Sequence, residues 1–179
     1  MKKIIIIFCL FNIFYVLNFS LNESVFKIIS KDFANNENIP VLFSCQGKNI
    51  SPELEWKNPP RGTKSFVLIM DDPDAPMGTF VHWVIYNIPF NRTKLMRNFP
   101  RFNNEKMSIK QGKNSLKRIG YMGPCPPPGK AHRYFFKLYA LNKILNLPPG
   151  LSKREVLKKI KPFIISKVEL VGFYKRLKR

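Results

Sequence analysis

The chain has 179 residues, 45% of them hydrophobic and 13% aromatic, so a single domain with a sizeable core is expected. It contains 31 Lys and Arg against 11 Asp and Glu, and its formal net charge is +20. The sequence shows no internal repeat, coiled-coil heptad or low-complexity tract, which excludes repeat and fibrous architectures. The charge favours anionic partners or reflects a general compositional bias, and it does not specify the fold.

Residues 1–20 are typical of a secretory signal peptide. The basic start Met1-Lys2-Lys3 precedes an almost wholly apolar run from Ile4 to Leu17, which is short for a membrane span. We therefore expect an exported protein, periplasmic or extracellular, with a single domain over residues 21–179. An uncleaved signal anchor that holds the protein at the membrane is the alternative.

Two cysteines lie outside this leader, Cys45 and Cys125. In an oxidising compartment such a pair is more often a disulfide than a metal or catalytic couple. The sequence therefore makes Cys45 and Cys125 the candidates for a disulfide bond.

Strands dominate the expected secondary structure. Short runs rich in β-branched and aromatic residues, bounded by turn formers, indicate strands at 25–29, 65–70, 81–88, 132–141 and 163–174. A further short strand carries Leu54 and Trp56 on one face. Gly172 lies inside the last strand and indicates a bulge there.

Two polar segments are expected to be irregular. Residues 35–38 (Asn-Asn-Glu-Asn) form a polar loop in this interpretation. Residues 91–118 hold nine basic residues and one acid with weak periodicity, so we expect an excursion over the surface.

One helix is expected near the C-terminus. Ser152 and Glu155 have the spacing of a capping box, Val156, Leu157 and Ile160 provide an apolar stripe, and Pro162 ends the pattern. With few places for crossover helices, the chain is expected to be mainly β, with an antiparallel sheet.

The most unusual stretch is 71–83, which places three carboxylates, two prolines and a glycine between two strands. His82 enters the second of these strands, and period 2 places Val84, Tyr86 and Ile88 on its face. The other histidine, His132, follows a second Pro/Gly-rich loop at 120–129 and opens another strand. The two histidines therefore hold matching positions.

With the two strands side by side, polar side chains converge. We expect Asp72, Asp74, His82 and His132 to meet, with Tyr134 one pleat further along. Two imidazoles, a tyrosine hydroxyl and loop amides suit a small oxyanion such as phosphate, and the carboxylates would orient the imidazoles or bind an amine. The alternative is that the acids cap turn amides while the histidines pack.

These blocks resemble the phosphatidylethanolamine-binding protein family, and its bacterial and archaeal Raf-kinase-inhibitor-like branch in particular. The resemblance covers nearly all of the chain after the leader. It is carried by Asp72-Pro73-Asp74-Ala75-Pro76, His82-Trp83, Asn87-Ile88-Pro89, the loop 120–127, His132-Arg133-Tyr134 and the closing stretch 170–174.

The resemblance implies a large antiparallel sheet packed on a smaller one, with one or two short peripheral helices. It also implies a pocket for phosphate-type groups or phospholipid headgroups, and a binding protein without catalytic activity or cofactor. Regulation of a partner protein, Raf kinase inhibitor-like, and contact with an anionic membrane surface are further expectations. The matching pocket positions are Asp72, Asp74, His82, Pro126, His132 and Tyr134.

Two other functions are weighed. A polyanion or nucleic-acid binder would use the basic surface, with Phe99, Phe102 and Tyr174 available for stacking, although basic loops are usually just solvated. A metal-dependent hydrolase could use two His and two Asp as zinc ligands, but no His-x-His or His-Glu-x-x-His spacing supports it. No metal site is therefore expected.

Overall fold

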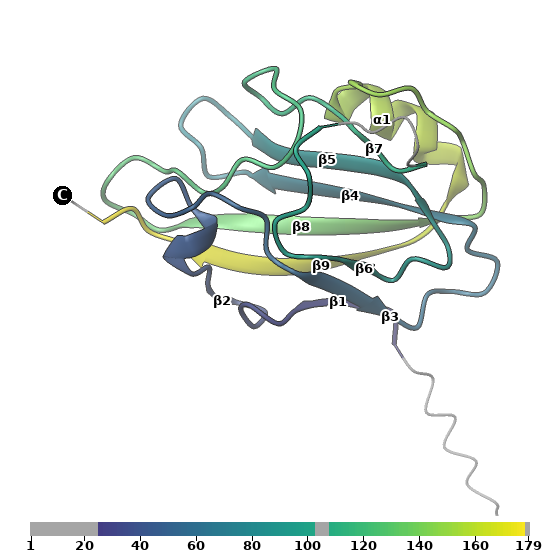
Figure 1. Cartoon of the computed structure of the whole chain (residues 1–179), viewed down its shortest axis with the longest axis horizontal. Coiled ribbons are helices and arrows are strands. Elements are labelled where there is room, and N and C mark those ends of the chain that lie inside the picture. Colours follow the sequence, from purple (N-terminus) through teal and green to yellow (C-terminus); the bar gives the residue numbers. More distant parts are fainter. Residues whose placement is uncertain (1–24, 103–107, 178–179) are drawn as a thin grey trace, which may run out of the picture.

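The computed structural model describes residues 25–102 and 108–177, so the predicted leader at 1–20 lies outside the described residues. Two sheets make up this part of the chain (Figure 1). The smaller sheet has the order β1-β3-β6 and the larger one β2-β9-β8-β4-β5-β7. The small-sheet strands are β1 (Lys27–Ser30), β3 (Leu54–Lys57) and β6 (Lys94–Leu95). The large-sheet strands are β2 (Glu37–Asn38), β4 (Ser65–Asp72), β5 (Phe80–Pro89), β7 (Lys110–Gln111), β8 (His132–Leu141) and β9 (Ile164–Tyr174).

The mainly β architecture with a large and a small sheet confirms the expected fold class. One strand pair departs from the antiparallel pattern, because β2 runs parallel to the end of β9. The polar segment 35–38 was therefore wrongly expected to be only a loop. Two residues without apolar alternation carry no strand signal, and the pairing depends on β9 being alongside.

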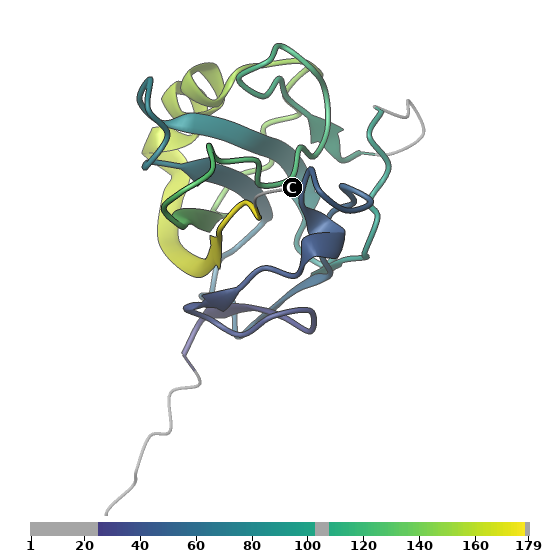
Figure 2. The ribbon, with the colours of Figure 1, turned by 90° about the vertical axis from the view of Figure 1, so that its left-hand side faces the viewer.

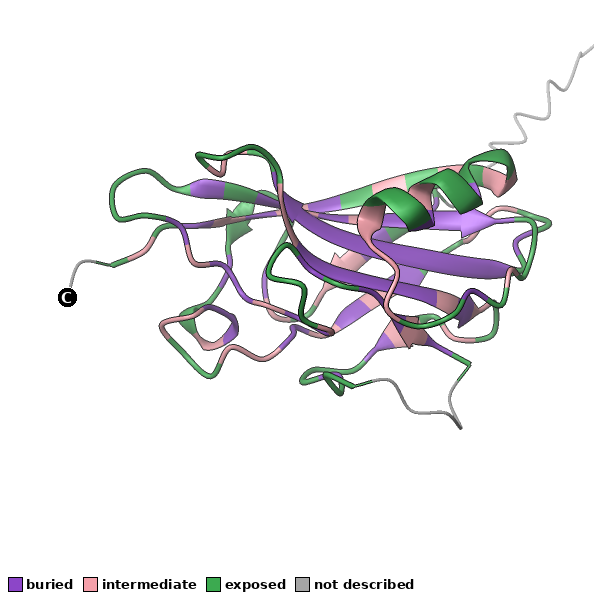
Figure 3. Ribbon diagram, turned by 90° about the horizontal axis from the view of Figure 1, so that it is seen from above, coloured by how far each residue is buried: buried purple, intermediate pink, exposed green. Residues whose placement is uncertain are grey.

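Both faces of the large sheet are covered, which explains why every residue of β4 is buried. Phe66, Leu68 and Met70 lie in the core shared with the small sheet. Val67 and Ile69 face the other way, into a second core under the helix α1 (Lys153–Ile160). Figure 3 shows this helix over the buried strands, with its outer side exposed. A strand buried on both sides reads as a continuous apolar run.

The helix α1 confirms the predicted capping box. The Ser152 hydroxyl accepts a hydrogen bond from the Glu155 amide, and the Glu155 carboxylate accepts one from the Ser152 amide at 2.8 Å. Val156 and Ile160, one turn apart, are buried against the sheet. The chain then passes through a 3-10 turn, η2 (Lys161–Phe163), which contains Pro162, and enters β9. The other 3-10 turn is η1 (Val41–Phe43).

The basic segment 91–118 is anchored more firmly than a surface excursion, so that expectation was wrong for its described parts. It contributes β6 and β7, and Leu95, Phe99 and Gln111 are buried. The Gln111 side chain accepts a hydrogen bond from the Trp83 indole at 2.7 Å and donates one to the Pro100 carbonyl. These anchors are isolated in the sequence, so no periodicity marks them.

Gly172 is a close-approach glycine and not a bulge. It pairs in register with both Tyr134 and Glu37. A Cβ at this position would lie 2.5 Å from a side-chain carbon of Ile39, so a larger residue would displace the segment that leads into and out of β2.

No helix among residues 25–102 and 108–177 is long and apolar enough to cross a membrane.

Candidate functional site

A β-bulge in β5 determines where His82 points. Met70 of β4 pairs with Trp83, but the next residue, Asp71, pairs with Val81, so His82 is an extra residue with no partner on β4. Bulges of this kind re-aim a side chain. Val84 and Tyr86 lie in the core under α1, whereas His82 lines a cavity on the opposite face with Tyr134.

The expectation that His82 shares a face with Val84, Tyr86 and Ile88 was therefore wrong. Period 2 holds only along an unbroken ladder, and β5 has a second irregularity, between Ile85 and Ile88. That second shift places Ile88 in the core shared with the small sheet.

The cavity has a volume of about 150 Å³, and its lining residues belong to the strand ends and loops at the end of the molecule that faces the viewer in Figure 2. This is several times the roughly 30 Å³ that one water occupies in the liquid, but well below the ~300 Å³ at which drug-sized pockets begin. It fits a phosphate-sized group or a small headgroup and not a whole lipid. The predicted residues that line it are Asp72, His82, Pro126, His132 and Tyr134.

Asp72 and His132 form the polar base of the cavity. Nδ1 of His132 donates a hydrogen bond to a carboxylate oxygen of Asp72 at 2.8 Å, and both side chains are buried. The same carboxylate accepts a hydrogen bond from the amide of Asp74, which fixes the start of the loop. Because Nδ1 is engaged, Nε2 is the His132 nitrogen left for a ligand.

His82 is oriented by a backbone carbonyl. Its Nδ1 donates to the Met122 carbonyl at 2.8 Å, and the His82 carbonyl accepts from the Met122 amide. Burial lowers the pKa of His82, while the Met122 hydrogen bond and the Asp72 charge raise it in part. The His82 ring packs edge-on against Tyr134, with the ring centroids 5.2 Å apart. In the ligand-free protein, burial therefore favours the neutral imidazole, and the hydrogen bond to Met122 selects the tautomer that is protonated at Nδ1.

The Tyr134 hydroxyl is buried and forms no hydrogen bond of good geometry, although the Asp72 carboxylate lies close enough to interact with it. Burial, reinforced by the nearby Asp72 charge, raises the pKa of this phenol, which therefore stays protonated. Among the residues that the structure describes, two other buried side-chain atoms also lack a hydrogen bond, on Glu53 and Trp56, but neither of these residues lines the cavity. An unpaired buried hydroxyl costs about 1–3 kcal/mol. A ligand oxygen in the cavity would remove that cost.

Asp74 does not line the cavity. Its carboxylate accepts hydrogen bonds from the Arg133 guanidinium at 2.6 and 2.9 Å and from the Arg133 amide at 2.9 Å. The Arg133 side chain lowers the pKa of Asp74 to about 2. Arg133 alternates with His132 and Tyr134 along β8, so it points to the other face of the sheet and takes Asp74 with it.

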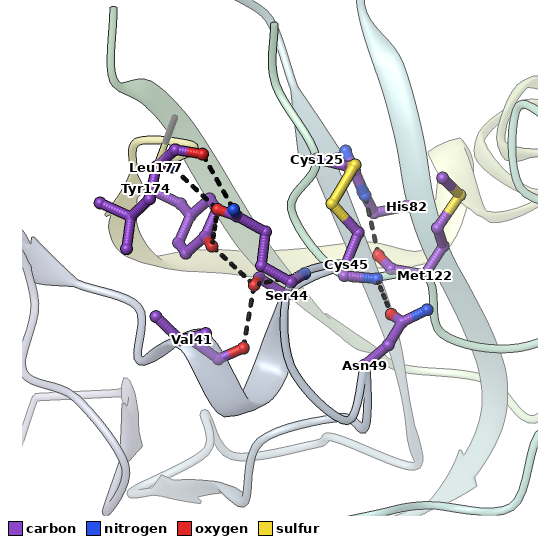
Figure 4. The surroundings of a disulfide bond; sticks show 11 residues. Val41, Ser44, Cys45, Asn49, His82, Met122, Cys125, Tyr174 and Leu177 are labelled. Carbon is purple, nitrogen blue, oxygen red and sulfur yellow. Dashed lines mark hydrogen bonds between the residues drawn. A yellow bond between two sulfur atoms is a disulfide. The ribbon is translucent and has the colours of Figure 1, made fainter. Parts of the chain in front are cut away.

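The second loop is held against residues 43–49 beside the cavity (Figure 4). Cys45 and Cys125 are joined in a disulfide with a Cα–Cα distance of 5.4 Å, as predicted from their pairing outside the leader. The Cys45 amide donates to the Pro124 carbonyl, and the Asn49 side chain accepts from the Gly123 amide at 2.7 Å. Cys125 also lines the cavity, so the disulfide fixes one of its walls.

Sequence reasoning missed several apolar residues of the wall. Phe80 packs on the His82 ring with centroids 4.8 Å apart, and Met122 supplies the orienting carbonyl. Phe80 lies two residues before His82, so strand alternation would have placed both side chains on the same face. The Met122 contact is made by a backbone carbonyl in a loop, and such a contact has no sequence signal. The other missed wall residues are Ala75 and Cys125, whereas Pro76 and Pro127 line the cavity as part of the two proline-rich loops expected to rim it.

The described residues bear on the two alternative functions. Nowhere in them do three or more His, Cys, Asp or Glu side chains gather as a metal site would require. Phe99 and Tyr174, considered for base stacking, are buried at 5% and 3% exposure, whereas Phe102 is exposed. Phe99 packs on Trp83 and Tyr174 donates to Gln46, so neither ring is free to stack on a base.

Comparison with known proteins identifies the family. Residues 29–175 match the family model described as phosphatidylethanolamine-binding protein. A UPF0098 protein of Aquifex aeolicus is 49% identical over 160 residues, which cover 88% of this chain and 93% of that protein. The UPF0098 protein PH1269 of Pyrococcus horikoshii is 46% identical over 151 residues, covering 83% and 76%.

Two solved structures are similar in fold. One is a putative phosphatidylethanolamine-binding protein homologue, CT736, from Chlamydia trachomatis, with a TM-score of 0.78, 36% identity and coverage of 86% of this chain and 99% of that one. Escherichia coli YbcL, described as a member of the mammalian PEBP family, also has a TM-score of 0.78, with 31% identity and coverage of 85% and 99%. The chain belongs to the phosphatidylethanolamine-binding protein family and is similar to its bacterial and archaeal members.

Proposed function

We propose that this protein is a binding protein without catalytic activity, whose cavity holds the phosphate-type group of a small ligand or a phospholipid headgroup. The observation that carries the proposal is the buried Tyr134 hydroxyl, which forms no hydrogen bond of good geometry and lines a phosphate-sized cavity. Nδ1 of each cavity imidazole is already occupied, so the donors that a ligand would meet are the Tyr134 hydroxyl and, in a ring that takes up a proton on binding, Nε2–H.

The same residues explain why the ligand would be anionic. Nδ1 of His132 is held by the Asp72 carboxylate, so an anion at Nε2, on the other side of the ring, would place the imidazole between two negatively charged groups. A zwitterionic headgroup would place its amine outside the cavity, near the rim. The volume supports a headgroup or a free anion equally, so the experiment must separate them.

The test is a thermal shift with inorganic phosphate and with phosphoethanolamine, at constant ionic strength set by potassium chloride. We expect both ligands to raise the Tm of the wild type and His132→Ala to abolish the rise. A larger rise with phosphoethanolamine would indicate a headgroup. A rise that persists in His132→Ala would refute the proposed cavity, and an equal rise with chloride alone would show general charge screening.

Export is part of the proposal and rests on the sequence of residues 1–20. Cell fractionation with N-terminal sequencing of the purified protein tests it, and an intact Met1 on a protein in the cytosol would refute it. Regulation of a partner protein and contact with an anionic membrane surface stay predictions from the family resemblance. The hydrolase alternative is tested by metal analysis, in which stoichiometric zinc would favour it.

A further inference from the structure

A basic groove lies on the face of the large sheet opposite the cavity, between the loop 113–118 and the start of α1. Its volume is about 520 Å³, more than three times that of the cavity. Residues at the start of β5 and just before it alternate between the two hollows. Phe80 and His82 line the cavity, whereas Thr79 and Val81 line the groove. The groove is therefore a separate site that shares a strand with the cavity but none of its side chains.

Four cationic side chains line the groove: Lys113, Lys117, Lys153 and Arg154. No acidic residue is among the described residues that line it. Lys153 pairs with the buried Asp71, but Asp71 also pairs with Lys137, so the three groups keep a net positive charge. In the described part of the chain, Lys113, Lys117 and Arg154 form no ion pair with a carboxylate.

The nearest acid is occupied elsewhere. Glu155 accepts hydrogen bonds from the Ser152 hydroxyl and amide in the capping box, and these contacts lower its pKa, with Lys113 and Arg154 lowering it further. Its carboxylate is not among the residues that line the groove, but it lines an adjoining hollow that shares Lys113, Lys117 and Arg154 with it, so it offsets part of the cationic charge there. The capping box also satisfies the first amides of α1, so the helix terminus is not the source of the site.

The backbone of the groove is built rigidly. The Lys113 amide donates to the Leu151 carbonyl, which ties the loop to the approach of α1. The Ser115 hydroxyl accepts from the Val81 amide at 2.8 Å, and the Ser115 amide donates to the Val81 carbonyl. The Asn114 side chain closes the loop by accepting from the Leu116 and Arg118 amides. Only the ends of the cationic side chains remain to adapt to a ligand.

Lys117 has a backbone conformation that its residue type rarely adopts. Its φ is +62°, and the other six described residues with positive φ that are not glycine are all asparagine. Asparagine tolerates this region through local hydrogen bonds, whereas lysine has no such compensation. A lysine at a position suited to asparagine is explained if its charge has a use, since strained residues cluster at functional sites.

We propose that this groove binds a compact polyanion that carries several phosphate groups. Four lysine and arginine charges around one hollow match a ligand with several negative charges better than a single phosphate. The volume exceeds that of the cavity and lies in the range of small-molecule sites, about 300–1,000 Å³. The site does not depend on the cavity or on its proposed ligand.

The test uses tripolyphosphate, titrated into the metal-free protein by calorimetry at low ionic strength. The lead variant is Lys117→Asn, which removes one charge and suits the backbone conformation. We expect it to raise the Tm in the absence of ligand and to weaken tripolyphosphate binding several-fold. The double variant Lys117→Glu/Arg154→Glu is expected to weaken binding about tenfold or more.

The matched control is Arg61→Glu/Lys64→Glu, which changes the net charge equally at the opposite end of β4, where both residues are exposed. Its affinity is expected to stay within about twofold of the wild type. Equal losses in the two double variants would overturn the site, because only the overall charge would then matter. His132→Ala is expected to retain tripolyphosphate binding, and loss in that variant would assign the ligand to the cavity instead.

A second measurement needs no variant. Lysine acetylation of the wild type, read by mass spectrometry, is expected to slow at Lys113 and Lys117 when tripolyphosphate is present, with Lys64 unaffected. Uniform or absent protection would overturn the proposal. Tighter binding of single-stranded DNA, weakened by Lys117→Asn, would overturn the compact ligand and favour a nucleic acid.

Discussion

Asp72 and His132 come from different strands, sixty residues apart, and are joined by a hydrogen bond of 2.8 Å at the base of the cavity. We expect Asp72→Asn to weaken phosphate binding about tenfold or more, because an amide holds the His132 ring by a weaker hydrogen bond than a carboxylate does. Calorimetric titration with phosphate checks this. An unchanged affinity would show that the pair is only structural.

Loss of the Tyr134 hydroxyl is expected to change stability and phosphate affinity in opposite directions. Tyr134→Phe removes an unpaired buried group, so we expect the ligand-free protein to gain up to about 1 kcal/mol in stability while phosphate binds more weakly. The control is Tyr121→Phe, because the Tyr121 hydroxyl donates to the Phe43 carbonyl at 2.9 Å. That variant should lose about 1–2 kcal/mol. Urea denaturation of both variants gives the comparison, and destabilisation by Tyr134→Phe would contradict it.

Anion binding is expected to take up protons. Both imidazoles have Nδ1–H engaged, so a neutral ring offers only an unprotonated Nε2, which repels an anion. Sulfate is the suitable probe, because its charge does not change near neutral pH. Its affinity should rise by up to about tenfold per pH unit for each proton taken up as the pH falls from about 8 to 6. A pH-independent affinity would exclude the imidazoles as donors.

The ligand-free protein should show the opposite trend. Burial lowers the pKa of His82 in the folded state below its unfolded value. The contribution of this group to stability is therefore fully present above about pH 6.5 and is lost as the pH falls through the lower folded value. Thermal unfolding at several pH values, with and without sulfate, separates the two effects.

Asp74 offers a test of the site boundary. Its carboxylate binds Arg133 outside the cavity, so Asp74→Asn should leave phosphate affinity within about twofold of the wild type. Its pKa is lowered to about 2, so its stabilising effect is present above pH 3.8 and is lost as the pH falls toward 2. A large loss of phosphate affinity in Asp74→Asn would show that this residue does contribute to the ligand site.

The disulfide should matter for both stability and binding. It closes a loop with a sequence separation of 80, which in the chain-entropy model corresponds to about 4 kcal/mol. Because Cys125 lines the cavity, reduction should also weaken phosphate binding. Urea denaturation and titration with and without reductant test this. The double variant Cys45→Ser/Cys125→Ser, in which reductant should change nothing, is the control.

The sequence predicted the convergence of the histidines and Asp72, because each lies at the junction of a strand and an unusual loop. It could not predict the orientation of His82, since a bulge depends on how two strands pair. The position of Asp74 was missed for a related reason. Asp74 follows Asp72 in a loop, and only the register of β8 shows that Arg133 faces away from the cavity.

The anchors of the basic segment 91–118 show a different limit. Gln111 is polar by sequence, yet it is buried because the Trp83 indole and the Pro100 carbonyl satisfy it. Such pairing involves three distant segments. The capping box of α1, by contrast, is complete within four residues and was therefore predictable from the sequence.

His82 is an extra residue in β5. Opposite Met70 and Asp71, the strand is one residue longer than continuous pairing with β4 requires. Deleting His82 would join Val81 directly to Trp83 and leave both neighbours facing the cores that they already occupy. A chain shortened in this way should therefore keep its sheet but lose half of its imidazole pair. The fold tolerates the irregularity, and the binding site depends on it.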